Sequence, residues 1–169
     1  APAEADVLKA MLATIEGMGL RALRDRAILA VGMAGAFRRS ELAAMQLPDL
    51  AFAQSGLRIT IPQSKRDQEQ VGQVIAIPEG RIIRPVNLLK HWLHAAGLSG
   101  LDPATGKPRQ GAVFRRLTRS DALTDNPITD KTVARLVKTA AAAAGLDPSL
   151  YSGHSLRAGF LTEAASKRA

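Results

Sequence analysis

The hydrophobic positions in the first part of the chain recur at helical spacing. The pattern covers residues 3–17 and 21–33, and glycines end the first of these stretches. A third, short helix is expected over 41–45, because Ser40 can act as its N-cap. The N-terminal part of the chain is therefore predicted to be helical.

The middle of the chain shows a different pattern, with short runs of alternating apolar and polar residues. A turn-like Gln-Ser-Gly segment separates the first run from the second, and Pro62 and Pro78 end the second and third runs. A polar hairpin connection over 63–72 joins the second run to the third. These features predict a small three-stranded antiparallel sheet. The strands are expected at 49–53, 57–61 and 73–77.

Helical spacing returns in the C-terminal half. Helices are predicted over 84–96 and 130–144, and Thr129 is the expected N-cap of the second. Because the chain has no internal repeat and no interdomain linker, these elements predict one α+β domain that is mostly α. The other segments are interpreted as a loop at 99–111, a short strand or extended piece at 113–117 and a loop at 120–127.

Length and composition exclude several classes of protein. The 169 residues are enough for one domain with a sizeable core, and an apolar content of 46% is too high for a disordered chain. No apolar run approaches the length needed to span a membrane. The sequence has no Cys, which excludes disulfides and thiolate nucleophiles and fits an intracellular protein.

The charge indicates a polyanionic partner. The net charge is +8 and the sequence pI is near 10.6, so nucleic acid is the first candidate, although a basic domain without such a partner remains the alternative. The few aromatic residues are scattered, which argues against binding of single strands by stacked aromatics. A duplex contacted through Lys and Arg fits the composition better.

One candidate interface is a basic face of the predicted 130–144 helix. Lys131, Arg135 and Lys138 recur at helical spacing on a face different from the apolar one. Such a face contacts either water or a DNA backbone, and the sequence leaves both interpretations open.

Several other residues are interpreted as structural. Trp92 is assigned to packing, and Tyr151 to packing or a hydroxyl hydrogen bond. His91 and His94 have a spacing that could bind a metal, but no carboxylate or Cys lies nearby in the sequence, so they are interpreted as ordinary surface or boundary histidines. A solvated surface is expected for the basic residues Arg115, Arg116 and Arg119.

The segment at 152–160 contains the first candidate for phosphate chemistry. His154 and Arg157 are three positions apart, which places both side chains on one face of a helix. A His moves protons near neutral pH, and an Arg binds two oxygens of one phosphate. A capped helix start that holds these two residues by chance is the alternative.

Three more residues complete a set with known chemistry. Arg38 and Glu41 are also three positions apart, and Lys65 lies in the polar connection. With His154 and Arg157 they supply what metal-free phosphoryl transfer needs: arginines for the phosphate charge, a Lys and a His for proton transfer, and an orienting carboxylate. The sequence has no carboxylate cluster for Mg²⁺, no Walker loop and no dinucleotide fingerprint, so no metal and no cofactor are expected.

In this order the motifs resemble the catalytic domain of tyrosine recombinases, the phage integrase family. Arg-x-Ser-Glu-Leu begins at Arg38, Lys65 matches a hairpin lysine, and His-x-Leu-Arg-x-Gly begins at His154. The resemblance runs from about Val7 to the end of the chain. In one departure, Ala158 stands where the family often has His.

The resemblance implies metal-free DNA strand exchange by the full-length protein. A Tyr would attack the scissile phosphate and form a 3′-phosphotyrosyl bond, and a freed 5′-hydroxyl would reverse the step on another strand. The implied catalytic set is Arg38 and Arg157 as the phosphate clamp, Lys65 as general acid, His154 as proton-transfer partner and Glu41 as the orienting carboxylate. The residues expected to contact DNA are Arg39, Arg66, Lys131, Arg135 and Lys138.

Two parts of the family architecture are missing from residues 1–169. These are the N-terminal DNA-clamping domain and the C-terminal segment with the nucleophile. The only Tyr in the sequence, Tyr151, precedes His154 and is in the wrong place for that role. The chain is therefore expected to be a partial catalytic domain that does not cleave DNA by itself.

The resemblance also implies partners and a location. We expect double-stranded DNA as partner, no membrane, a cytoplasmic protein associated with DNA, self-association of the full-length protein into a tetrameric synapse on DNA, and a monomer for this chain. Two alternatives remain. One is a non-catalytic DNA-binding relative or remnant of an integrase. The other is a type IB topoisomerase, which shares much of the catalytic set.

Overall fold

A computed structural model describes residues 2–62 and 72–151, and its elements confirm the mostly helical α+β fold with a small antiparallel sheet. The helices are α1 (Pro2–Ala13), α2 (Leu20–Ala34), α3 (Arg39–Ala44), α4 (Pro85–Ala95) and α5 (Asp130–Ala143), with 3₁₀ turns η1 (Leu47–Asp49) and η2 (Pro148–Tyr151). The strands are β1 (Leu50–Ala53), β2 (Gly56–Ile61), β3 (Gln73–Pro78), β4 (Arg115–Leu117) and β5 (Leu123–Pro127).

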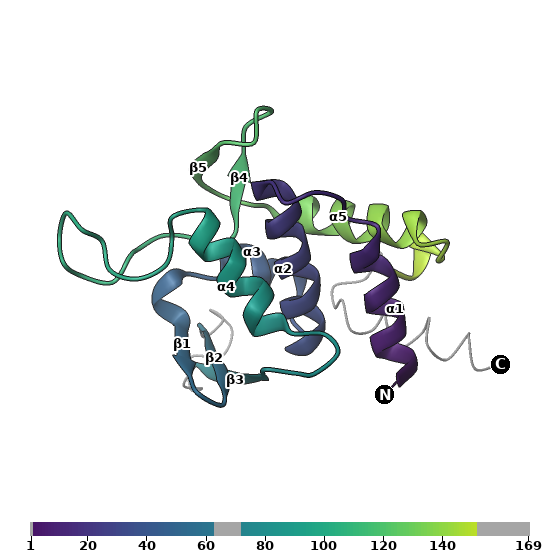
Figure 1. Ribbon diagram of the computed structural model, residues 1–169, viewed down its shortest axis with the longest axis horizontal. Helices are drawn as coiled ribbons and strands as arrows, with labels where there is room; N and C mark the ends of the chain where they lie inside the picture. Colours follow the sequence, from purple (N-terminus) through teal and green to yellow (C-terminus); the bar gives the residue numbers. More distant parts are fainter. Residues whose placement is uncertain (1, 63–71, 152–169) are drawn as a thin grey trace.

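Helix α2 lies at the centre of the core. Every residue from 27 to 31 is fully buried, so this part of the helix is covered on all sides. Helix α4 packs along α2, while α1, α3 and α5 contact it elsewhere. Figure 1 shows α4 beside α2, while α5 runs crosswise to α2 and extends toward α1. The functional side chains described below are attached to this central helix or to its neighbours.

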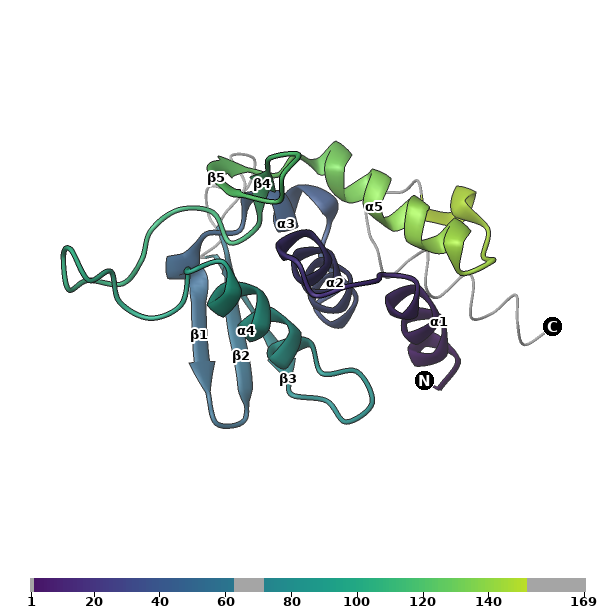
Figure 2. The same cartoon turned by 45° about the horizontal axis from the view of Figure 1, so that its top comes forward.

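The three-stranded sheet has the order β1-β2-β3, and both strand pairs are antiparallel, as predicted. Leu57, Ile59 and Ile77 are buried on one face of the sheet, whereas Arg58 and Thr60 are exposed on the other. This alternation follows from the period of two residues along a strand. Helix α4 lies over the sheet in Figure 2, and the buried face joins the helical core.

The end of α1 differs from the prediction. The helix ends at Ala13 and does not continue to Gly17. The Thr14 hydroxyl donates a hydrogen bond of 2.7 Å to the carbonyl oxygen of Met11, which satisfies one of the free carbonyls of the last turn. A side chain that can bond to the backbone in this way competes with continuation of the helix.

The prediction of a loop at 120–127 is wrong, because strand β5 lies there and pairs antiparallel with β4. Leu117 pairs with Leu123, and Arg115 pairs with Pro127. The sequence of β5, Leu-Thr-Asp-Asn-Pro, contains residues that are depleted in strands, so the pairing partner determines its conformation. The β4–β5 hairpin projects from the helical body in Figure 1.

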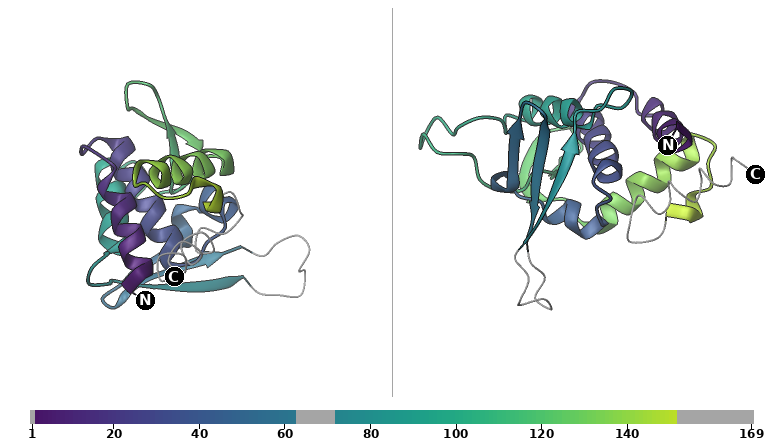
Figure 3. Two further views of the ribbon diagram at one scale, coloured as in Figure 1. Left: turned by 90° about the vertical axis from the view of Figure 1, so that its right-hand side faces the viewer. Right: turned by 90° about the horizontal axis from the view of Figure 1, so that it is seen from below.

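Helix α5 starts as predicted. The Thr129 hydroxyl oxygen accepts a hydrogen bond from the backbone N–H of Thr132 at 3.2 Å, which is the expected N-cap contact. Val133 and Val137 are fully buried on the inner face of the helix. Figure 3 shows α5 from two further sides, and α5 packs against α3 as well as α1.

Trp92 is a packing residue, as predicted. Its side chain is fully buried, and its indole N–H donates to the carbonyl oxygen of Val113 at 2.8 Å. Tyr151 is also buried, at the end of η2.

In residues 2–62 and 72–151, no helix combines the length and the apolar character needed to cross a lipid bilayer.

Candidate functional site

The junction between α2 and α3 positions Arg38. After α2 the chain turns through Ala36, whose φ of 53° is in the left-handed region. The N–H of Phe37 bonds to the carbonyl of Gly32, and the N–H of Ala36 bonds to that of Met33, which is a Schellman ending. The Phe37 side chain is buried, so the following residue is held at the surface of the core.

Arg38 is the N-cap of α3, so the prediction that Ser40 caps this helix is wrong. The Glu41 carboxylate accepts a hydrogen bond of 2.7 Å from the backbone N–H of Arg38. The contact runs one way, because an Arg side chain has no acceptor atom. The guanidinium of Arg38 is exposed, and within residues 2–62 and 72–151 no oxygen accepts a hydrogen bond from it.

A pocket of about 380 Å³ brings the start of α3 next to the end of the sheet. Arg38 and Glu41 form part of its wall. Ile61 and Gln73 also line it, and they are the paired residues at the ends of β2 and β3 where the connection between these strands begins. The pocket therefore combines a cationic side chain with the ends of the two strands whose connection contains Lys65.

Arg39 is the first residue of α3 and is half-buried. Its Nε atom is buried and has no hydrogen-bond partner among the residues that the structure describes. Its assignment to DNA contact stays a prediction. Four other predicted residues lie outside the described ranges, and their roles also stay predictions. They are Lys65, Arg66, His154 and Arg157.

The basic face of α5 is exposed to solvent. Lys131, Arg135 and Lys138 are all exposed, while Val133 and Val137 fill the core on the opposite side of the helix. None of these three cations forms an ion pair with a described acidic residue. Their positive charge is therefore available to a polyanion.

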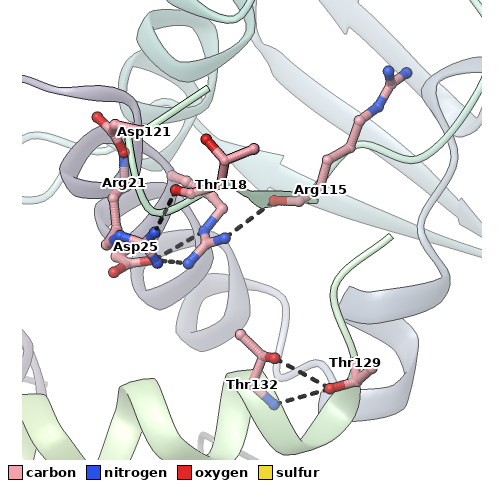
Figure 4. A network of polar contacts seen from close by, with 8 residues as sticks. Arg21, Asp25, Arg115, Thr118, Asp121, Thr129 and Thr132 are labelled. Carbon is pink, nitrogen blue, oxygen red and sulfur yellow. Dashed lines mark hydrogen bonds and ion pairs between the residues drawn. The ribbon is translucent and has the colours of Figure 1, made fainter. Parts of the chain in front are cut away.

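Two other arginines are buried, and sequence reasoning missed both as structural residues. Arg24 of α2 donates to the Asp25 carboxylate at 3.0 Å and to the carbonyl oxygen of Arg115 at 3.1 Å. The Arg115 side chain in turn donates to the carbonyl oxygens of Ala112, at 2.9 Å, and Gln110, at 3.1 Å. The hydrogen bond to the Arg115 carbonyl joins α2 to β4, as Figure 4 shows.

The expected solvated surface around Arg115 is therefore only partly correct. Arg116 and Arg119 are exposed, but Arg115 is 7% exposed, because its guanidinium satisfies carbonyl groups of the preceding loop. The guanidinium lies directly over Gly111, where a Cβ atom would come within 2.6 Å of it. A glycine four residues before an arginine was the only local signal of this packing.

Burial changes the titration of Asp25. Removal of the carboxyl group from water raises its pKa above the usual 3.8, and the neighbouring Arg24 guanidinium lowers it by a smaller amount.

Arg21 adds a second link between α2 and the hairpin. Its backbone N–H donates to Asp121 at 3.0 Å, and its guanidinium donates to the Thr118 carbonyl at 3.2 Å.

The two helical histidines are ordinary surface residues, as predicted. His91 and His94 are both exposed on α4. Within the described ranges, no group of three or more His, Cys, Asp or Glu side chains is arranged to hold a metal ion.

The family model that matches this chain is described as the phage integrase family, and the match covers residues 3–169. The chain belongs to the phage integrase family. Within it, the chain is 43% identical over 148 residues to an integrase/recombinase xerD homolog of Selenomonas ruminantium. The aligned region covers 86% of this chain and 40% of that relative, so the chain spans well under half of the relative's length.

Solved structures show the same fold. A crystal structure of XerH site-specific recombinase, bound to palindromic difH substrate in a post-cleavage complex, matches with a TM-score of 0.63 and 16% identity. The match covers 96% of this chain and 41% of XerH. The crystal structure of XerA recombinase matches with a TM-score of 0.58 and 17% identity, over 95% of this chain and 48% of XerA. The fold of this integrase-family chain is thus that of recombinase domains.

Proposed function

We propose that this chain is the phosphate-activating part of the catalytic domain of a site-specific DNA recombinase. The observation that carries the proposal is the exposed Arg38 at the start of α3, held by Glu41 in a pocket at the base of the β2–β3 connection. A planar guanidinium with free donors is the side chain best suited to hold two oxygens of a phosphodiester. Membership of the phage integrase family supports this assignment.

The proposed reaction is metal-free transesterification. A Tyr hydroxyl gives up its proton, and its oxygen attacks the scissile phosphorus to form a phosphotyrosyl bond while the bond from phosphorus to the 5′ oxygen breaks, so that the phosphate stays on the 3′ oxygen. Arg38 and Arg157 stabilise the extra charge on the non-bridging oxygens, and Lys65 donates the proton that the departing 5′ oxygen takes up. His154 assists proton transfer. Glu41 holds the backbone from which Arg38 projects.

The nucleophilic Tyr is proposed to come from outside residues 1–169, as is a DNA-clamping domain. The share of 40% that the chain covers in its xerD-homolog relative supports a longer functional protein. The sequence has one Tyr, and Tyr151 is 2% exposed, which is unsuited to attack on DNA. We expect that the chain alone forms no covalent adduct with a nicked suicide duplex. A phosphotyrosyl adduct trapped on such a duplex would contradict this.

Double-stranded DNA is the proposed partner, and the basic face of α5 is its proposed contact. The XerH structures contain a difH substrate, which supports a DNA partner for this chain. Removal of the three charges in Lys131→Gln, Arg135→Gln and Lys138→Gln should weaken duplex binding and reduce the slope of log K against log salt. The slope should fall by about 0.9 for each phosphate that the variant no longer neutralises.

A matched control shows whether a smaller salt slope results from loss of the α5 face or from the lower net charge of the protein. The control protein carries three substitutions of exposed cations on other elements, and it should keep most of the salt slope. These substitutions are Lys9→Gln, Arg58→Gln and Arg81→Gln. If both triple variants show the same decrease in slope, binding depends on net charge alone and the α5 interface is wrong.

A second candidate is a DNA-binding relative that occupies sites without cutting them. The burial of Tyr151, the only Tyr in the sequence, is the observation that favours it. The gene sequence after the codon for Ala169 separates the two candidates. A reading frame that continues to a His or Trp and then a Tyr supports the recombinase, and a stop codon supports the binder.

Assembly on DNA is part of the same proposal. We propose that the full-length protein forms a tetramer on its sites and that this chain alone is a monomer. Sedimentation equilibrium of the chain without DNA should therefore give a mass near 17.9 kDa. A stable tetramer without DNA would contradict the proposal.

A further inference from the structure

A second pocket lies where α4, η1 and β1 meet the loop over 99–111. It shares no lining residue with the Arg38 pocket and encloses about 530 Å³. Sites for small molecules typically enclose about 300–1,000 Å³. Most of the wall is apolar. The apolar wall residues are Leu47, Leu50, Phe52, Leu93, Leu98 and Pro108.

The charged residues of this pocket all have the same sign. Lys90 and Arg109 line it together with His94, and no carboxylate does. Lys90 is positioned by Phe52, because its Nζ lies 5.4 Å from the centre of the ring. Arg109 is positioned at the base of the loop, where its Nε donates to the carbonyl oxygen of Ser99 at 3.1 Å. Both cations are thus held at the edge of an apolar cavity.

The loop that forms one wall is closed by its own hydrogen bonds. The backbone N–H of Asp102 donates to the carbonyl of Lys107 at 2.8 Å, and the N–H of Gly106 donates to the carbonyl of Asp102 at 2.7 Å. Leu101 pairs with Pro108 in a β-bridge, and its side chain is 61% exposed next to the pocket residue Gly100. Figure 1 shows this loop extending beyond the end of α4. The wall is a built structure that offers further apolar surface to a ligand.

We propose that this pocket binds a small amphipathic organic anion. An aromatic or branched aliphatic group would lie against the leucines and Phe52, because burial of apolar surface is favourable. The acidic end, a carboxylate or sulfonate, would face Lys90 and Arg109. The positive charges of Lys90 and Arg109 disfavour a cationic ligand, and a neutral apolar ligand would gain no electrostatic attraction from them. The proposal does not depend on the recombinase assignment.

The probe for this site is 2-naphthoate, and the matched neutral compound is 2-naphthalenemethanol. Calorimetric titration of the whole chain at low salt should give one site for 2-naphthoate. The neutral alcohol should bind about 10-fold more weakly, since it lacks the charge that two partly exposed cations attract. Equal affinity of the two compounds, or no binding of 2-naphthoate at millimolar concentration, would overturn the proposal.

Variants locate the site. Lys90→Gln should weaken 2-naphthoate binding about three- to fivefold and leave the alcohol unchanged. Lys9→Gln, an exposed lysine on α1, is the matched control and should bind as the wild type does. Ser99→Trp places a large side chain at the pocket and should block both compounds. Equal unfolding midpoints confirm that the variants fold, and unchanged binding in both Lys90→Gln and Ser99→Trp would overturn the proposal.

Discussion

The arginines on either side of this comparison have opposite surroundings: the first set is Arg24 and Arg115, and the second is Arg38 alone. Arg24 and Arg115 are buried between α2 and the β4–β5 hairpin, and their guanidinium groups donate to backbone carbonyls and to Asp25. Arg38, at the other end of α2, is exposed, and its guanidinium has no acceptor among the described residues. The first set connects elements of the fold, and the second is available to a ligand.

The difference shows that positive charge alone does not mark a functional residue. Arg115 and Arg116 are neighbours in the sequence, yet one is buried in the fold and the other faces solvent. The hydrogen-bond partners of each guanidinium decide its role, because a buried Arg is tolerated only when its donors are satisfied. The comparison predicts that substitutions of the buried arginines lower stability, whereas a substitution of Arg38 affects only the proposed reaction on DNA.

The largest effect on stability is expected for Arg115→Met. The substitution removes both donors to Ala112 and Gln110 and leaves their carbonyl oxygens unsatisfied, which should cost about 3 kcal/mol of unfolding free energy. Urea denaturation measures this value. The matched control is Arg116→Met on the same strand, which should change stability by less than about 0.5 kcal/mol. Equal effects of the two substitutions would remove the distinction between the sets.

A smaller loss is expected for Asp25→Ala. It leaves the Arg24 side chain, which is 5% exposed, without its carboxylate partner, at a cost of about 2 kcal/mol. Asp25→Asn keeps an acceptor for Arg24 and should lose less than about 1 kcal/mol. If the alanine and asparagine variants unfold at the same urea concentration, the hydrogen bond between residue 25 and Arg24 contributes nothing to the unfolding free energy.

The same pair gives a pH prediction. Because the pKa of Asp25 is raised above 3.8 in the folded state, the folded protein binds this proton more tightly than the unfolded chain does. The contribution of Asp25 to stability is therefore fully present below pH 3.8 and falls as the pH rises through the folded pKa. The difference in unfolding free energy between wild type and Asp25→Asn should decrease as the pH rises from 3.8 through the folded pKa of Asp25. A difference that grows with pH would show that the ion pair with Arg24 outweighs burial. Asp6→Asn, at an exposed carboxylate, is the control.

The smallest change in unfolding free energy is expected for Ala36→Gly, in the turn before Arg38. Ala36 has a φ of 53°, a conformation that costs a residue with a Cβ atom roughly 1 kcal/mol and costs Gly much less. Ala36→Gly should therefore stabilise the chain by about 0.5–1 kcal/mol in urea denaturation. Ala43→Gly, in the last turn of α3, is the control and should destabilise by a similar amount, because Gly disfavours the helical conformation. A loss of stability in Ala36→Gly would mean that the turn before Arg38 is unstrained.

Local patterns in the sequence predicted much of the fold. The strands of the three-stranded sheet and the Thr129 cap follow from alternation and from one side chain, and the structure confirms them. The start of α3 was predicted incorrectly. The Glu41 carboxylate, and not the Ser40 hydroxyl, accepts a backbone N–H hydrogen bond at this end of the helix. Strand β5 was missed because its composition does not favour a strand and its conformation comes from pairing with β4. The burial of Arg115 was missed although its guanidinium bonds to carbonyls only three and five residues before it, because charge alone indicates exposure.

The candidate site was predictable to the extent that its residues form short motifs. Arg38 and Glu41 were identified from their spacing, and the structure places them together at one pocket. Ile61 and Gln73 line the same pocket because the tertiary fold brings the end of the sheet close to the start of α3, and spacing along the sequence does not contain that information. The structural roles of Arg24 and Asp25 were missed for the same reason.

The most direct test of the account is strand cleavage on a nicked suicide duplex by the longer protein that we propose contains this chain. Arg38→Ala should reduce the cleavage rate at least about 100-fold, the typical loss for one donor to a transition-state oxyanion, and leave the unfolding midpoint unchanged. Arg58→Ala, at an exposed arginine on β2, is the control and should cleave at the wild-type rate. Wild-type cleavage by Arg38→Ala, or a loss that parallels a lower unfolding midpoint, would contradict the assignment of Arg38 to the phosphate.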